Sequence, residues 1–468
     1  LNNNGALIKR GPGTLQLTLT APTTLTVGNG AGSSEPQPDP IVFPADGSAP
    51  ASGFTGLTVA EGTLRLIGSP DFTTRMEHMV NIGTKTLQGS VAPALELVGG
   101  RFAVGGGSMA TWVGPWCWSG TVLTNAALRI FDSSITVNTL LLGAGGTCQT
   151  QTPELLIDHS TIDVYWRTGW SDQIGNTPAM TTIRNGSTLF VQQTDISLNN
   201  PFSVLIDNST VECRNSTPTS GRVRFGGNAC GTFTIANSGR LSVPRIRMES
   251  GRNEGVHIVF DGGVLQPTIT EMLLFQNAGK HSVDLMDRGA TFEINSALTY
   301  TVAHPLTGNG GLTKTGSGTL IFGPTMTEAG SATNMTGLVT GQYTGITRIE
   351  AGTLVVSNGA LRADAAVALN TDAQLNAGGA ALPLAKLSGS GTVVNGTVEP
   401  AAIAPGAQDG DIATLAVDSI TCANTVFACD VQQNLTSGTV LTNDMLHVAG
   451  TISGTAIVDF GRNTADPL

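Results

Sequence analysis

The stretch that decides the fold is TGNGGLTKTGSGTLIFGP at residues 307–324, followed by YTGITRIEAGTLVVSNG at residues 343–359. It contains the step Gly-Thr-Leu twice, at 318–320 and at 352–354, and each step is followed by apolar residues and a turn. Glycine can take a positive φ angle in a turn, and threonine and branched apolar residues favour strands. The stretch therefore predicts one unit of a repeat built from short strands and tight turns.

A first copy of this unit lies near the start of the chain. KRGPGTL at 9–15 matches KTGSGTL at 314–320 in spacing, and FTGLT at 54–58 and EGTL at 61–64 match YTGIT and AGTL. Between these halves lies a Pro-rich segment at 33–50, SSEPQPDPIVFPADGSAP. Proline cannot donate a hydrogen bond to a strand ladder, so we expect a surface loop there.

The middle of the chain repeats a simpler pattern, in which two short strands of period two flank a polar corner. In three repeats the two strands begin seven residues apart, at Leu128 and Ile135, Leu155 and Ile162, and Val204 and Val211. The corner positions are Ser134, Ser160, Ser187, Ser209, Gly239, Gly263 and Gly289, which are 22 to 30 residues apart. A period in this range indicates stacked repeats.

The period and the composition together favour one repeat architecture. Long apolar runs at helical spacing are missing, which argues against leucine-rich or ankyrin solenoids, and propeller blades need about 40 residues each. We predict an all-β parallel β-helix, or β-solenoid, of roughly fourteen coils with inward Val, Leu and Ile stacked along its axis. We assign residues 1–400 to this β-helix and residues 401–468 to a C-terminal continuation of the solenoid.

The charge pattern excludes several partners. The net charge is −11, only 12% of residues are charged, and the 23 Lys and Arg residues are scattered along the sequence. Nucleic-acid binding and docking on an anionic membrane are therefore disfavoured. No apolar run reaches 18 residues, so we expect no membrane-spanning helix. The chain begins at Leu1 without Met or a signal peptide, which we interpret as a mature or trimmed product.

The six cysteines form three pairs that are close in sequence. We expect disulfides in an exported protein, and the alternative is six buried thiols in a reducing cytosol. The pairing suggested by proximity is Cys117 with Cys148, Cys213 with Cys230, and Cys422 with Cys429.

The segment GGLTKTGSGTL at 310–320, with YTGIT at 343–347 and AGTL at 351–354, resembles the autotransporter-associated β-strand repeat. The step APG at 404–406 and the segment 444–450 are similar to the C-terminal parts of such passenger proteins. The resemblance implies a bacterial, exported, surface-associated protein with a right-handed parallel β-helix. Members are usually adhesin-like or structural passengers, most without an assigned activity.

No residue pattern indicates catalysis, a metal or a cofactor. Asp158-His159-Ser160 has the residue types of a catalytic triad, but adjacent residues cannot reach triad geometry by themselves. A polar corner of a coil explains them better. The remaining histidines are isolated, and the motifs of polygalacturonase-like and calcium-dependent sites are absent. We therefore predict no enzyme, although a polysaccharide lyase or hydrolase on the same fold stays an alternative.

Aromatic residues concentrate in one part of the chain. Exposed aromatic rings stack against sugars, so this cluster is the candidate glycan-binding site; the alternative is that the rings are buried, as Trp usually is. The cluster consists of all five Trp residues and one Tyr: Trp112, Trp116, Trp118, Tyr165, Trp166 and Trp170.

These observations favour a non-enzymatic extracellular or bacterial cell-surface protein with a structural or adhesive role. Open solenoid ends present unpaired strand edges, so we expect self-association into a fibre or a surface layer. A glycan-binding adhesin acting on surface polysaccharide through the Trp cluster is the alternative.

Overall fold

A computed structural model describes the fold at residues 2–3, 7–9, 11–21, 24–27, 56–59, 61–77, 79–82, 92–104, 112–115, 126–142, 153–171, 179–193, 195–199, 201–215, 221–226, 228–248, 255–275, 281–302, 304–323, 340–356, 360–406, 412–432 and 442–462. These residues form strands and turns without any helix, so the chain is all-β as predicted. In the same residues there is no helix that could cross a membrane. The Pro-rich segment 33–50 lies outside them.

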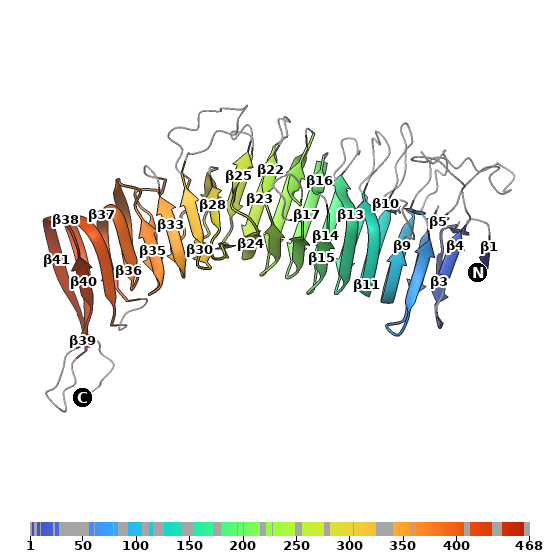
Figure 1. The fold of residues 1–468 in the computed structure, drawn as a ribbon, viewed down its shortest axis with the longest axis horizontal. Helices are drawn as coiled ribbons and strands as arrows, with labels where there is room; N and C mark the ends of the chain where they lie inside the picture. Colours follow the sequence, from blue (N-terminus) through green and yellow to red (C-terminus); the bar gives the residue numbers. More distant parts are fainter. Residues whose placement is uncertain are drawn as a thin grey trace. The chain divides into compact units, whose positions relative to one another are not determined.

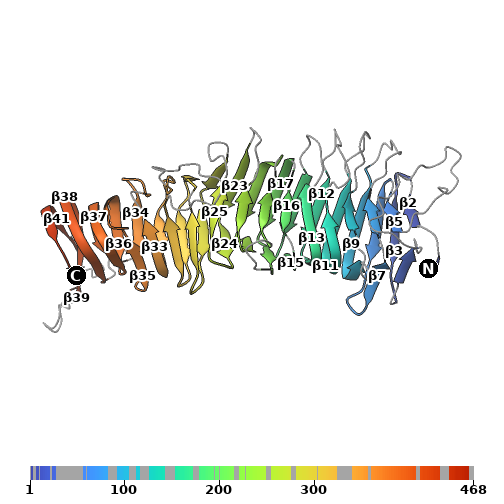
Figure 2. The ribbon, with the colours of Figure 1, turned by 45° about the horizontal axis from the view of Figure 1, so that its top comes forward.

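The chain divides into two compact units, residues 1–258 and residues 259–468. In each unit, short strands follow one another around a coil and pair in parallel with strands of the next coil (Figures 1 and 2). This is the parallel β-helix that the repeat period predicts. The number of coils and the right-handed sense stay predictions. Strand β37 (Thr392–Pro405) runs through residue 400, where the sequence showed no firm boundary between the β-helix and its C-terminal continuation.

In the described part of unit 1 the strands form three columns, named 1A, 1B and 1C. Column 1A consists of β3 (Thr14–Thr18), β6 (Thr63–Ile67), the start of β9 (Ala94–Val104), the start of β11 (Ala127–Leu141), β12 (Glu154–Asp158), β14 (Ala179–Arg184), β17 (Pro201–Asp207) and β20 (Cys230–Ala236). Column 1B consists of β1 (Asn2–Asn3), β4 (Thr24–Val27), β7 (Thr73–Glu77), the end of β9, the middle of β11, the start of β13 (Thr161–Ser171), β15 (Thr188–Val191), β18 (Thr210–Cys213) and β21 (Arg240–Val243). Column 1C consists of β2 (Leu7–Lys9), β5 (Gly56–Val59), β8 (Met79–Ile82), β10 (Trp112–Pro115), the ends of β11 and β13, β16 (Ile196–Leu198), β19 (Val223–Phe225) and β22 (Ile246–Met248).

In the described part of unit 2 there are again three columns, named 2A, 2B and 2C. Column 2A contains β26 (Ser282–Leu285), β29 (Leu306–Gly308), single bridges at Gly341 and Leu361, the start of β36 (Ala381–Gly389) and parts of β37, β38 (Thr414–Gln432) and β41 (Ile452–Arg462). Column 2B contains β24 (Gly263–Pro267), β27 (Ala290–Glu293), β30 (Leu312–Thr315), β32 (Thr347–Ile349), β34 (Ala366–Leu369) and further parts of β36, β37, β38 and β41. Column 2C contains β25 (Glu271–Phe275), β28 (Thr299–Val302), β31 (Thr319–Phe322), β33 (Gly352–Val356), β35 (Ala373–Asn376), the starts of β37 and β38, and β40 (Met445–Val448). Two strands fall outside the columns: β39 (Thr442–Asn443) pairs antiparallel with β38, and β23 (Val256–Asp261) contains the boundary between the units.

The core consists of ranks of inward apolar side chains, one from each coil. In column 1A the rank Leu64, Leu95, Leu128 and Leu155 is in register, and each side chain is completely buried. Alternate residues of a strand point to opposite faces, so the period-two pattern of the sequence places these residues in one interior.

The outward neighbours of that rank form a ladder of alternating charge. Arg65 lies 2.6 Å from Glu96, and Arg129 lies 3.6 Å from Glu96 and 2.9 Å from Glu154. Opposite charges on directly neighbouring strands favour the observed register, because a shift of one strand along its neighbour would separate the paired charges.

The polar corners lie between columns 1A and 1B in unit 1 and between columns 2A and 2B in unit 2, and two of them lie one residue from where the sequence pattern suggested. Ser133, not Ser134, takes the position of Ser160, and Gly262, not Gly263, takes the position of Gly289. The residues before the two corner serines, Asp132 and His159, have positive φ angles of 48° and 46°. The turn itself therefore sets the alignment, and the pattern of residue types alone did not reveal it.

Candidate functional site

The repeat unit that decides the fold has a buried lysine at its corner. Lys314 is completely buried, and its Nζ donates hydrogen bonds to the carbonyl oxygens of Thr315 (2.9 Å), Gly316 (2.6 Å) and Ala351 (2.9 Å). Burial lowers the pKa of Lys314 to about 8. The lysine therefore ties one corner to the corner of the next coil.

The glycine of the next Gly-Thr-Leu step fits against the same corner. Gly352 has a φ of 71°, and a Cβ there would lie 2.5 Å from the Gly318 oxygen and 2.6 Å from the Gly316 oxygen. The first copy has the same arrangement: Lys9 Nζ donates to the carbonyl oxygens of Gly11 and Glu61. The lysine and glycines that carry the family resemblance thus have a structural role, which the sequence pattern did not assign to the lysine.

The corner Asp158-His159-Ser160 is structural in its contacts. His159 Nδ1 lies 2.7 Å from Asp132 Oδ1 on the neighbouring coil, not near Ser160. The buried Ser160 Oγ donates to the Asp158 carbonyl oxygen (2.7 Å) and accepts from the Ser133 amide (3.0 Å). Burial raises the pKa of Asp158, but hydrogen bonds from Asn185 and Arg184 outweigh it and leave that pKa below its usual value. These contacts are those of a polar corner.

The aromatic cluster is only partly within the described residues. Trp116 and Trp118 lie outside them, and for Trp112, Trp166 and Trp170 the structure describes the backbone alone. Tyr165 has an exposed side chain, 54% accessible. Whether the rings form a glycan-binding surface therefore stays a prediction.

The backbone nevertheless brings the two Trp-bearing strands into one column. In column 1C, Trp112 of β10 pairs with Thr139 of β11, which in turn pairs with Arg167 of β13. The register shifts where β13 passes Tyr165 and Trp166, and again where it passes Trp170. Such β-bulges change the direction of side chains and are common beside functional sites.

The predicted disulfides of the described residues are wrong. Cys213, Cys230, Cys422 and Cys429 are all buried, and no disulfide joins any two of them. Cys213 and Cys230 belong to different columns, and burial raises the pKa of the Cys213 thiol. Cys422 and Cys429 lie seven residues apart on β38, on the two sides of the corner at Asn424, which has a φ of 58°. Cys117 and Cys148 lie outside the described residues.

Proximity in sequence failed as a guide to cysteine pairing, because the corners of a coil place cysteines that are close in sequence on different sides of it. The four described cysteines are buried thiols, so they do not support the expectation of export that rested on disulfides. In the described part of the chain no group of three His, Cys, Asp or Glu residues could hold a metal ion.

The segment 444–450 carries a buried acid that the sequence reasoning did not single out. Asp444 is 3% exposed, and its Oδ1 accepts a hydrogen bond of 2.9 Å from the Ala413 amide, at the start of the stretch that leads into β38. The acid fixes β40 beside β38, so it belongs to the architecture of the last coil.

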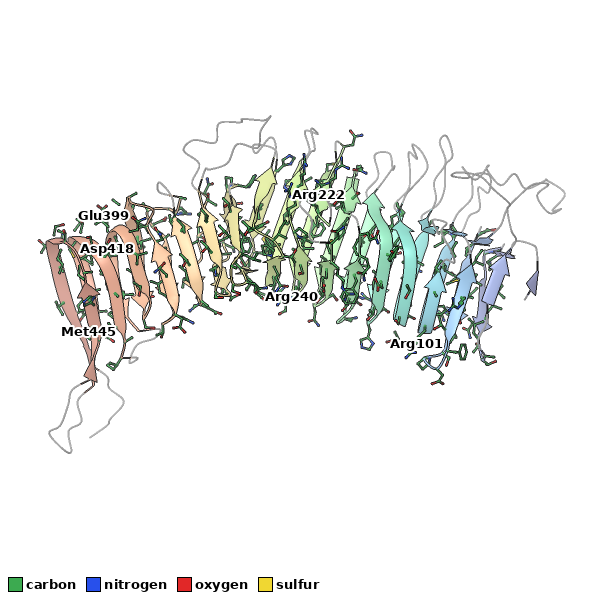
Figure 3. All side chains as sticks on the ribbon, in the orientation of Figure 1. Arg101, Arg222, Arg240, Glu399, Asp418 and Met445 are labelled. Carbon is green, nitrogen blue, oxygen red and sulfur yellow. The ribbon has the colours of Figure 1, made fainter. Side chains whose placement is uncertain are left out.

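The unusual surface of the molecule is at this last coil, on β40 and β41. Ile452 is in register with Ile420, which is 1% exposed, and with Val398, which is completely buried; yet Ile452 is 67% exposed. The rank of core residues therefore continues to β41 and is uncovered there. Among the described residues, half of the large exposed apolar side chains lie in this region: Val426, Met445, Ile452, Ile457 and Val458 (Met445 is labelled in Figure 3).

The first strand of column 1A has the same feature. Leu15 of β3 pairs with Leu64 of β6, a completely buried residue, but Leu15 is 40% exposed. Among the described residues, β3 pairs only with β6, and β40 and β41 pair only with β38. We call these two surfaces the β3 edge and the β41 edge. Each combines an uncovered apolar rank with a strand that is paired on one side only.

The sequence predicted open strand edges at the solenoid ends, but it did not reveal which residues are uncovered there, because Leu15 and Ile452 have the same residue types as buried members of the ranks. No protein-family model, no curated protein and no solved structure matches this chain.

Proposed function

We propose that this chain is a non-enzymatic extracellular or cell-surface protein with a structural or adhesive role, and that it self-associates into a fibre or layer. The observation that carries the proposal is the uncovered core rank at the β41 edge, where Ile452 is 67% exposed although its register partners are buried. Soluble proteins rarely leave a contiguous apolar patch open unless it is a contact surface.

The strand edge supports the same proposal. An unpaired edge offers a row of free amide and carbonyl groups, and natural proteins usually protect such edges with charges, proline or a covering segment. Residues 451–459 of the β41 edge are all exposed, and Asp459 is the single charged residue among them. This edge therefore favours addition of another strand.

The surface location rests on the repeat alone. The Gly-Thr-Leu unit resembles the repeat of autotransporter passengers. In both copies of this unit the lysine donates a hydrogen bond to a backbone carbonyl oxygen of the next coil. The buried cysteine thiols give no support for an oxidising compartment. Labelling of intact cells with an antibody against the chain tests the location; signal that appears only after lysis would contradict it.

Self-association is tested with the purified chain by sedimentation velocity and electron microscopy over a range of concentrations. We expect assemblies that grow with concentration, because each added copy buries apolar surface. A chain that stays monomeric at millimolar concentration would remove the proposal.

A glycan-binding adhesin is the second candidate. Two shifts of register on β13 favour it: the shift at Tyr165–Trp166 lies at the turn from column 1B into column 1C, and the shift at Trp170 lies in column 1C, which also contains Trp112. The test is binding to surface polysaccharide by wild type and by Trp112→Ala and Trp118→Ala variants, with Phe131→Ala as a control outside the cluster. Unchanged binding in the two Trp variants, or no binding by wild type, would contradict this candidate.

A further inference from the structure

Resting on the proposed self-association, we propose that two copies of this chain join head to tail, with the β41 edge of one copy receiving the β3 edge of the next. The partner is thus a second copy, and the contact is a parallel strand addition that continues both the strand ladder and the core rank. The direction of the strands, the uncovered apolar ranks and the charge of the two edges support this contact.

The direction of the strands selects the arrangement. The ladders of all six columns are parallel, and the short pair β38–β39 is the antiparallel exception among the strands described. A strand added to β41 in the same direction repeats the hydrogen bonding that β41 already makes with β38. Two copies joined by their β41 edges would be related by a twofold axis, which reverses strand direction and so gives antiparallel pairing. The head-to-tail contact alone extends the existing pattern.

The open ranks complement each other in the same arrangement. In the described part of the chain, no inward apolar residue of a further coil covers Ile452 at the β41 edge, and none covers Leu15 at the β3 edge. Neighbouring coils are about 4.8 Å apart, the distance at which each inward residue covers the one before it. Placing a β3 edge on a β41 edge therefore covers both sets of exposed core residues at once.

The charge of the edges permits the contact. The β3 strand, TLQLT, has no charged residue, and the β41 strand has Asp459 and Arg462 in its second half. A chain with a net charge of −11 repels a second copy over most of its surface, and two copies can approach at these edges because β3 has no charged residue and the two charges of β41 are of opposite sign.

Two single substitutions test the arrangement, because each blocks one edge. Ile452→Lys places a charge at the β41 edge, and Leu15→Lys places one at the β3 edge. Both side chains are already exposed, so we expect the unfolding midpoint to stay close to that of wild type. For each variant alone, the protein concentration at which filaments form should rise at least about tenfold. Mixed together, they should form a dimer and nothing larger, since one free edge of each kind remains.

A matched control uses another exposed apolar residue of unit 2. Met286, 40% exposed at the turn after β26, belongs to neither edge, and Met286→Lys should assemble as wild type does. Should either edge variant lose its fold, adding it in small amounts to wild type replaces the mixing test: a folded variant shortens the filaments by capping one end.

The outcomes separate this inference from the proposed function. A wild-type chain that never assembles removes both. Assembly that survives both edge variants removes the head-to-tail contact and leaves self-association intact. Dimers of Leu15→Lys alone, with none for Ile452→Lys, would show β41 edges pairing with each other and overturn the inference.

Discussion

The corner at Lys314 and the corner at Ser160 turn the chain in the same fold by different means. At Lys314 a buried ammonium group and closely packed glycines hold two coils together through backbone carbonyls. At Ser160 small hydroxyl groups form a ladder, in which each corner amide donates to the serine of the next coil: Ser133 to Ser160 (3.0 Å), Ser160 to Ser187 (3.1 Å) and Ser187 to Ser209 (3.1 Å).

The difference explains why one part of the sequence is recognisable and the other is not. The Lys314 corner needs particular residues, because a side chain at Gly352 would meet backbone oxygen atoms. The serine corner needs a small hydroxyl and a residue that tolerates positive φ, a condition that Asp, His and Asn all meet in this chain. The middle coils could therefore diverge and keep only their period.

The largest effect is expected from Gly352→Ala. The new Cβ would clash with two carbonyl oxygens and force a positive φ on alanine, which together should destabilise the chain by about 4 kcal/mol or more. Gly379→Ala is the matched control, because Gly379 has a φ of 78° with nothing within 4 Å of its Cβ position, and should cost only about 1 kcal/mol. Equal losses in urea unfolding would show that packing at the corner does not matter.

Lys314→Met should cost about 3 kcal/mol, because three partly buried backbone carbonyl oxygens lose their donor. The exposed Lys386→Met on β36 should change stability by no more than about 0.5 kcal/mol. The free energy of unfolding from urea titrations measures both. A neutral Lys314→Met would mean that water satisfies those carbonyls.

The same lysine predicts a pH dependence. Its pKa is about 8 in the folded chain and about 10.5 when unfolded, so between these values the unfolded chain binds the extra proton. Stability should therefore rise with pH from 8 to 10.5, by up to about 3 kcal/mol at 1.4 kcal/mol per pH unit. Below pH 8 the lysine is charged in both states and contributes no slope. The measurement is the difference between wild type and Lys314→Met across this window; a falling difference would contradict the prediction.

At the serine corner we expect smaller effects. Ser160→Ala removes a buried donor and the acceptor for the Ser133 amide, at a cost of about 2 kcal/mol. The exposed Ser203→Ala on β17 is the control and should be nearly neutral. A neutral Ser160→Ala would mean that the ladder does not stabilise the stack.

The smallest effect should follow from His159→Asn. The exposed His159–Asp132 pair contributes about 0.5 kcal/mol or less, and asparagine tolerates the positive φ of this position. Thermal unfolding of the variant should match wild type closely. A loss as large as that of Ser160→Ala would place the strength of this corner in the exposed pair instead of the buried hydroxyl.

Much of the fold could be read from particular residues. The spacing of seven between Leu155 and Ile162 correctly predicted two inward strands around a corner, since both residues are buried and lie in columns 1A and 1B. The exact corner residue was missed by one position at Ser133, because φ angles decide it and several residue types satisfy them. The predicted cysteine pairs failed because the corners of the coils separate cysteines that are close in sequence.

The sequence by itself determined the repeat, its period and the parallel β-helix, because inward residues must recur once per coil to fill a common interior. The tertiary structure alone decided which of these similar residues is covered. Ile420 and Ile452 are the same residue type at the same position of neighbouring coils, yet one is buried and the other is open. Burial depends on whether a further coil covers the residue, and the residue type does not indicate that. The edges that support the proposed assembly therefore belong to the structure, while the corners that make the coils belong to the sequence.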